Sequence, residues 1–126
     1  MKIKLDKVNP IDNGRIEIVI SKLNIIVPKE FITFFSEYNG AVGEIGNSYI
    51  MVYNIDDVLH FNVEAQKYIP DIFLFATNGG GEEYGINHRN GEYVRVPSIF
   101  CDYDDVEHIS DSLSGFIDYL ENQYNE

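Results

Sequence analysis

The sequence predicts an α+β fold, in which helices and antiparallel strands occupy separate stretches of the chain. Apolar residues recur at helical spacing in the first half and again near the C-terminus, and two strand-like runs flank Asn90-Gly91, a pair typical of a hairpin turn. With 126 residues and 44% hydrophobic content, the chain is long enough to bury a core as one unit. We therefore expect residues 1–126 to form a single domain.

The first segment, residues 11–24, fits two secondary structures. Its isoleucines within 16–20 alternate with other residues, as in a strand, and β-branched residues favour strands. Asp12 or Asn13 could instead cap a helix that Asn24 ends in the left-handed conformation. Four apolar residues recur at the spacing of such a helix: Ile16, Val19, Ile20 and Leu23. The pattern by itself leaves both structures open.

The next segments are clearer. Pro28 suits the first turn of a helix and Asn39-Gly40 suits its end. One apolar stripe lies between them, formed by Phe31, Ile32, Phe34, Phe35 and Tyr38. Residues 49–53 predict a strand, after which Asn54 can cap a helix with two acidic residues in its first turn. Pro70 stops any helix before it.

The second half of the chain predicts further strands. Residues 72–76 are a short apolar run, typical of a buried strand, and Asn78–Gly81 breaks it. Residues 82–87 and 92–96 are the two strands of the predicted hairpin, and residues 98–109 look irregular and acidic.

A closing helix follows the acidic stretch. Ser110 or Asp111 can begin it, because both residue types cap helices well. Its apolar face is formed by Leu113, Phe116, Ile117 and Leu120.

The net charge of −12 narrows the choice of partners. Nucleic acids and anionic membranes attract clusters of Lys and Arg, so we expect neither as a direct partner. A basic protein or a cationic ligand is favoured, because opposite charges speed encounter. The charge is uneven: residues 1–30 carry +2, residues 31–95 carry −6 and residues 96–126 carry −8. This asymmetry predicts an acidic face in the C-terminal third, although it is also compatible with a device for solubility alone.

The cysteine content and the N-terminus indicate a compartment. Cys101 is the single cysteine, so no internal disulfide can form, as is usual in a reducing cytosol. Residues 1–7 are charged where a signal peptide needs an apolar core, and no apolar run approaches the roughly 20 residues that cross a bilayer. We expect a cytoplasmic protein.

Candidate catalytic or metal-binding motifs are weak. Gly79–Gly81 could cradle a phosphate, but no Gly-Lys-Ser/Thr follows, so a tight turn is favoured. The acidic residues within 102–107 lack the glycine of a calcium loop. The three histidines have no metal-type spacing: His60, His88 and His108. We expect no catalytic residues, no metal and no cofactor.

Several ordered segments together resemble the SMI1/KNR4 family, also called the SUKH superfamily. An opening Ile-Val-Pro motif is followed by Phe34-Phe35 and Asn-Gly, and a later segment ends in Gly-Gly-Gly-Glu. Val27 and Ser112-Leu113 depart from the usual family residues but keep an apolar side chain in place. The segments that carry the resemblance are Ile25–Phe31, Phe34–Phe35, Tyr38–Gly40, Phe73–Glu82, Gly91–Val94 and Ile109–Leu120.

The resemblance implies a twisted, mainly antiparallel sheet with helices packed around it. It also implies a helix over residues 11–23, because a capped helix precedes the opening motif in the family. Bacterial members are commonly immunity proteins that bind and block a toxin domain of a polymorphic or contact-dependent system, often a nuclease. Fungal members are instead tied to the regulation of cell-wall synthesis.

We therefore expect an immunity protein whose acidic side chains and exposed tyrosines cover a basic cleft of the cognate toxin domain. A nuclease must attract phosphates, so an acidic surface is a suitable blocker. A regulatory or scaffolding module and a small-ligand binder are the alternatives. The expected partner-binding residues are Glu82, Glu83, Tyr84, Asp102, Tyr103, Asp104, Asp105 and Glu107.

Overall fold

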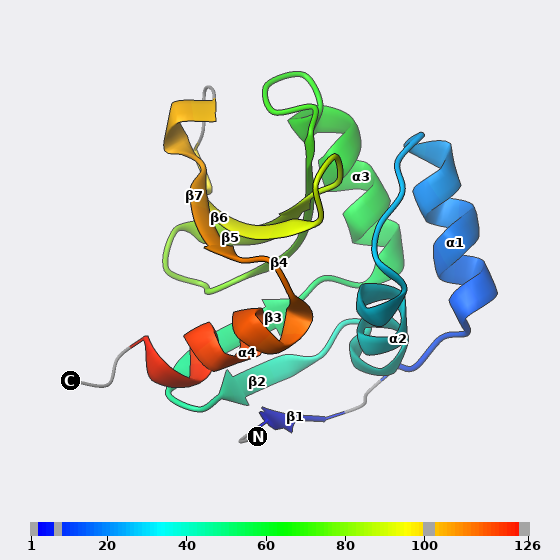
Figure 1. The fold of residues 1–126 in the computed structure, drawn as a ribbon. Coiled ribbons are helices and arrows are strands. Elements are labelled where there is room, and N and C mark those ends of the chain that lie inside the picture. Colours follow the sequence, from blue (N-terminus) through cyan, green and yellow to red (C-terminus); the bar gives the residue numbers. More distant parts are fainter. Residues whose placement is uncertain (1–2, 7–8, 100–102, 124–126) are drawn as a thin grey trace.

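The fold is built on one sheet of seven antiparallel strands in a computed structural model, which describes residues 3–6, 9–99 and 103–123. The strands lie in the sheet in the order in which they occur in the sequence (Figure 1). They are β1 (Ile3–Leu5), β2 (Val42–Ile45), β3 (Ser48–Val52), β4 (Ile72–Thr77), β5 (Glu82–Asn87), β6 (Glu92–Pro97) and β7 (Glu107–Ser110).

Along the chain, the helices lie between strands or after the last strand. Two of them separate β1 from β2, one separates β3 from β4, and the last follows β7. Figure 1 shows the first three gathered at one side of a bent sheet, while the last runs along β2 and β3. They are α1 (Asn13–Lys22), α2 (Lys29–Tyr38), α3 (Ile55–Ala65) and α4 (Leu113–Asn122), and a 3₁₀ turn, η1 (Tyr103–Asp105), precedes β7.

The larger core lies between the sheet and buried residues of α1, α2, α3 and α4. Phe31 of α2 packs with its ring centroid 4.9 Å from that of Phe75, and Phe75 lies 5.7 Å from Phe116 of α4. Because side chains alternate along a strand, Leu74, which precedes Phe75, faces the other way. A smaller core on that opposite face contains Ala65, Ile69, Ile72, Leu74, Val94 and Val96. The sheet thus has an apolar layer on each side of β4 and β6.

The structure decides the ambiguous first segment in favour of a helix. Asp12 caps α1, since its Oδ1 accepts a hydrogen bond from the backbone N–H of Arg15 at 2.9 Å. Asn24 follows the helix with φ of 56°, as its residue type allows. The predicted cap of α3 is also confirmed, because the side chain of Asn54 accepts from the backbone N–H of Asp57 at 3.0 Å.

The sequence did not predict β1, β2 or β7. Strands β1 and β7 are the two edges of the sheet, and β2 lies beside β1. The interpretation of residues 98–109 as irregular is wrong over β7, where the backbone pairs with β6 at Val94↔His108 and Arg95↔Glu107. An edge strand pairs on one side only. Strand β7 is short and its residues are exposed or half-exposed, so its sequence shows little apolar alternation. The closing helix also begins later than expected, with Ser112 as its cap.

Within the part of the chain that the structure describes, none of the helices combines the length and the apolar character that crossing a bilayer requires.

Candidate partner-binding site

The neighbouring acids Glu82 and Glu83 of β5 lie on opposite faces of the sheet, as strand geometry requires. The Glu82 carboxylate lies 3.0 Å from Nε of Arg95 and accepts a hydrogen bond from Nδ2 of Asn78 at 3.0 Å. The Glu83 carboxylate instead accepts from the hydroxyl of Ser98 at 2.8 Å. The two carboxylates therefore belong to separate surfaces and cannot work as a facing pair.

Arg95 of β6 links Glu82 to Glu107 of β7. Its Nη2 lies 2.6 Å from Oε2 of Glu107, and its guanidinium carbon lies 5.8 Å from the ring centroid of Tyr119. Burial disfavours the Arg95 cation, but the hydrogen bond to Glu107 and the nearby charges outweigh burial and raise the pKa of Arg95. The structure thus brings together two expected site residues, Glu82 and Glu107, around an internal cation that partly neutralises them.

Tyr84 does not belong to a partner-binding surface. Its relative exposure is 0%, and its ring centroid lies 5.4 Å from that of Phe116 in the larger core. Alternation along β5 turns Tyr84 toward α4, the face opposite to Glu83. The expectation that Tyr84 contacts a partner is therefore wrong.

The remaining expected residues lie in and around η1. Asp104 and Asp105 are exposed on this turn, and Glu107 is exposed at the start of β7. Asp102 and the side chain of Tyr103 lie outside what the structure describes, as does Cys101.

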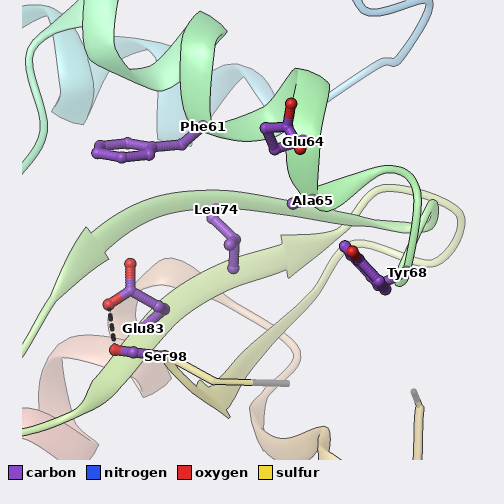
Figure 2. A pocket seen from close by; sticks show the side chains of 7 residues that line it. All are labelled: Phe61, Glu64, Ala65, Tyr68, Leu74, Glu83 and Ser98. Atoms are coloured by element: carbon purple, nitrogen blue, oxygen red, sulfur yellow. Dashed lines mark hydrogen bonds between the residues drawn. The ribbon is translucent and has the colours of Figure 1, made fainter. Parts of the chain in front are cut away.

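Glu83 contributes to a pocket that the sequence did not indicate. Figure 2 shows the pocket between α3 on one side and Glu83 with Ser98 on the other, with Leu74 of β4 between them. Its volume is about 330 Å³, at the lower end of the range of small-molecule sites. The residues that line it are Phe61, Glu64, Ala65, Tyr68, Leu74, Glu83 and Ser98.

The aromatic wall of this pocket could have been suspected from α3. The buried stripe of α3 runs through Ile55, Val58 and Ala65, and Phe61 stands beside that stripe with 43% exposure. A large apolar residue off the buried stripe of a helix is a signal for a surface contact. Nothing in the sequence indicates that Glu83, which lies more than 20 residues away, faces the same space.

Glu83 is held by two hydroxyl groups. The phenol of Tyr53 donates to Oε1, and the hydroxyl of Ser98 donates to Oε2. Burial, followed by the hydrogen bond and the charge of Glu83, raises the pKa of Tyr53 well above its usual range. Tyr53 therefore keeps its proton and acts as a donor, and its ring packs 4.9 Å from that of Phe61.

The turn after β4 is structural. Oδ1 of Asn78 accepts hydrogen bonds from the N–H groups of Gly80 and Glu82, at 2.8 and 3.2 Å. Gly79 has φ of 74°, and its N–H donates to the hydroxyl of Thr77 at 3.2 Å. These N–H groups are already bonded within the turn, which supports the prediction of a tight turn over that of a phosphate cradle.

Among the residues that the structure describes, one group of potential metal ligands forms near the β7 edge of the sheet. Glu92, His108 and Asp111 each offer one ligand atom, and these atoms lie within 4.8 Å of one another. His108 stands 3.2 Å from Glu92 and 3.7 Å from Asp111, with half of its side chain exposed. Such exposed groups are common in the absence of a metal, and a protonated His108 forms an ion pair with Glu92 and with Asp111.

The geometry defines a small α+β protein whose described surface carries exposed acidic side chains and an apolar pocket with aromatic residues at its edge. The model of the SMI1/KNR4 family (SUKH-1) matches residues 10–121, and the chain belongs to this family. The family includes immunity proteins, and its members are generally non-enzymatic immunity or regulatory proteins. A search among curated proteins finds no match.

Proposed function

We propose that this protein is an immunity protein that binds the cognate toxin domain of a polymorphic or contact-dependent toxin system and neutralises it. The observation that carries the proposal is that this chain belongs to the SMI1/KNR4 family and is strongly acidic at its C-terminal end. Residues 96–126 contain eight acidic side chains and neither Lys nor Arg. The exposed acids of η1 and β7 belong to this stretch: Asp104, Asp105 and Glu107.

The proposed mechanism is occlusion. A toxin that acts on nucleic acid must present a basic cleft, and an acidic surface of complementary shape competes with phosphate for that cleft. A stable complex of this kind buries on the order of 1,200–2,000 Å² in total. Its electrostatic part acts mainly on the association rate and weakens with salt, because exposed charges are screened. The toxin is also favoured to be basic because the net charge of this chain is −12.

The decisive experiment is co-expression with the toxin domain encoded beside this gene. We expect growth to be restored and the two proteins to co-purify as a stoichiometric complex. Restored growth without a complex would exclude occlusion, and no rescue with any neighbouring toxin domain would overturn the proposal. Catalytic destruction of the toxin is distinguished by substoichiometric protection, which occlusion does not allow.

A charge-reversal pair tests the electrostatic component. The double variant Asp104→Lys/Asp105→Lys should slow association about tenfold at low salt, and the difference should shrink as salt is raised. Glu17→Lys/Glu44→Lys, at exposed positions of α1 and β2, changes the net charge by the same amount and provides the control. An association rate that is independent of salt would exclude steering by these residues.

A further inference from the structure

The pocket beside α3 has an apolar interior with aromatic side chains at its edge. Leu74 and Ala65 belong to the smaller core and are buried, so they form a firm base. Phe61 is 43% exposed and Tyr68 is 54% exposed, and both lie on the α3 side of the opening (Figure 2). Exposed aromatic rings around a buried apolar base are typical of a site that receives a side chain from a partner.

The charge inside the pocket is negative. Glu83 reaches into it, and its two oxygens each accept one hydroxyl proton, from Tyr53 and Ser98. A carboxylate has about four acceptor positions, so two remain for a ligand. The described residues that line the pocket include no Lys or Arg. Glu64 adds a second carboxylate at the rim, where Lys67 stands 3.3 Å from it and both side chains are more than half exposed.

We infer that this pocket binds the guanidinium side chain of an arginine presented by the protein partner. The inference rests on the proposed function and names the chemistry of one contact. The aliphatic stem of an arginine would pack on Leu74 and Ala65, and its planar head would stack on Phe61. The head would donate to the two free acceptor positions of Glu83, a geometry that a planar fork of N–H donors matches and a lysine ammonium does not.

The two hydroxyl donors prepare Glu83 for this role. They hold the carboxylate toward the α3 side of the pocket before any partner binds, so little side-chain freedom is lost on binding. They do not neutralise its charge, as the guanidinium of Arg95 partly does for Glu82 on the other face.

The test titrates the full chain with Nα-acetyl-arginine methylamide as the probe and follows binding in ¹H–¹⁵N NMR spectra. We expect shifts that concentrate on the amides of Phe61, Leu74 and Glu83. The citrulline analogue, which has the same shape but no charge, should bind about tenfold more weakly. Glu83→Gln should weaken binding of the arginine probe by a similar factor, whereas Glu17→Gln, which removes the same charge from an exposed site, should change it by less than about twofold.

The variant Phe61→Ala and binding of the toxin domain provide two further tests of the arginine site. Phe61→Ala removes an exposed ring without touching Glu83, so it carries the test if Glu83→Gln fails to fold. Equal binding of the arginine and citrulline probes, or equal effects of Glu83→Gln and Glu17→Gln, would overturn the inference. So would a toxin complex that forms unchanged with Glu83→Gln and Phe61→Ala, and that result would leave the proposed function intact. Selective arginine binding without rescue by any toxin would support the pocket and refute the proposed function.

Discussion

Asn62 joins α3 to the sheet at a point where β3 no longer covers β4. Strand β3 pairs with β4 only at Met51↔Thr77 and Val52↔Ala76. Further along β4, the side chain of Asn62 takes the place of a neighbouring strand: its Oδ1 accepts from the N–H of Leu74, and its Nδ2 donates to the C=O of Leu74, both at 2.8 Å. Asn62 is 1% exposed, so these bonds are made away from water.

The magnitude of an Asn62→Ala change follows from the groups that it leaves behind. The N–H and C=O of Leu74 both lose their partner, and each buried unsatisfied group costs about 1–3 kcal/mol. We expect a loss of about 3 kcal/mol, a large part of the stability of an ordinary domain. With an m-value near 2 kcal/mol/M, this is a fall of about 1.5 M in the urea midpoint.

Asn122→Ala is the matched control. Nδ2 of Asn122 donates to the carbonyl of Asp118, four residues earlier in α4, as Nδ2 of Asn62 does to that of Val58 in α3. The Asn122 bond is exposed, so we expect its loss to cost less than about 0.5 kcal/mol. Urea unfolding followed by circular dichroism measures both. If the two variants lose the same stability, or if Asn62→Ala loses less than about 1 kcal/mol, the link between α3 and β4 does not have the role assigned to it.

Three further predictions concern stability. Gly46→Ala should cost at least about 2 kcal/mol in urea unfolding, because Gly46 has φ of 59° and an added Cβ would lie 2.5 Å from Cα of Glu121; a near-neutral result would refute the close approach of α4. Asp12→Ala should cost about 1 kcal/mol, and Asp12→Asn much less, since a cap needs only the acceptor oxygen; equal losses would exclude capping as the cause. Burial, followed by the charge of Glu30, raises the pKa of Tyr93 above its ordinary 10.0, so the unfolded chain releases this proton first and stability should fall as pH rises above 10. Tyr93→Phe should reduce that fall, and an unchanged slope between pH 9 and 11 would contradict it.

The predictable part of the fold is the part that the core dictates. The stripe of α2, the run of β4 and the hairpin of β5 and β6 are visible in the sequence, because burial on one face leaves a periodic apolar pattern. The choice of helix for α1 needed the family resemblance, since β-branched residues obscured it. The edge strands β1 and β7 were not predicted. A strand that pairs on one side only does not need a regular alternation of apolar side chains.

The site was predictable only in part, for a related reason. Alternation along β5 correctly separates Glu82 from Glu83, but it does not say which face is the core, and Tyr84 was therefore assigned to the surface in error. The pocket depends on the packing of α3 on β4, which brings α3 to the same space as Glu83 of the neighbouring strand β5, and no local pattern encodes that arrangement. Phe61 was visible as an aromatic residue on a helix, yet the carboxylate opposite it was not.

The structure also changes what the charge of the chain means for binding. An acidic count of this size suggests one continuous surface, but adjacent carboxylates on β5 have different electrostatic roles. Glu82 and Glu107 share the cation Arg95, so their charge is partly neutralised within the protein. Glu83 is oriented by two neutral hydroxyl groups instead, which fix its direction and leave its charge available. A long-range attraction of basic partners can arise from the whole acidic surface, whereas a specific contact requires a carboxylate that is both held in place and uncompensated. On the surface around β5, that combination is found at Glu83.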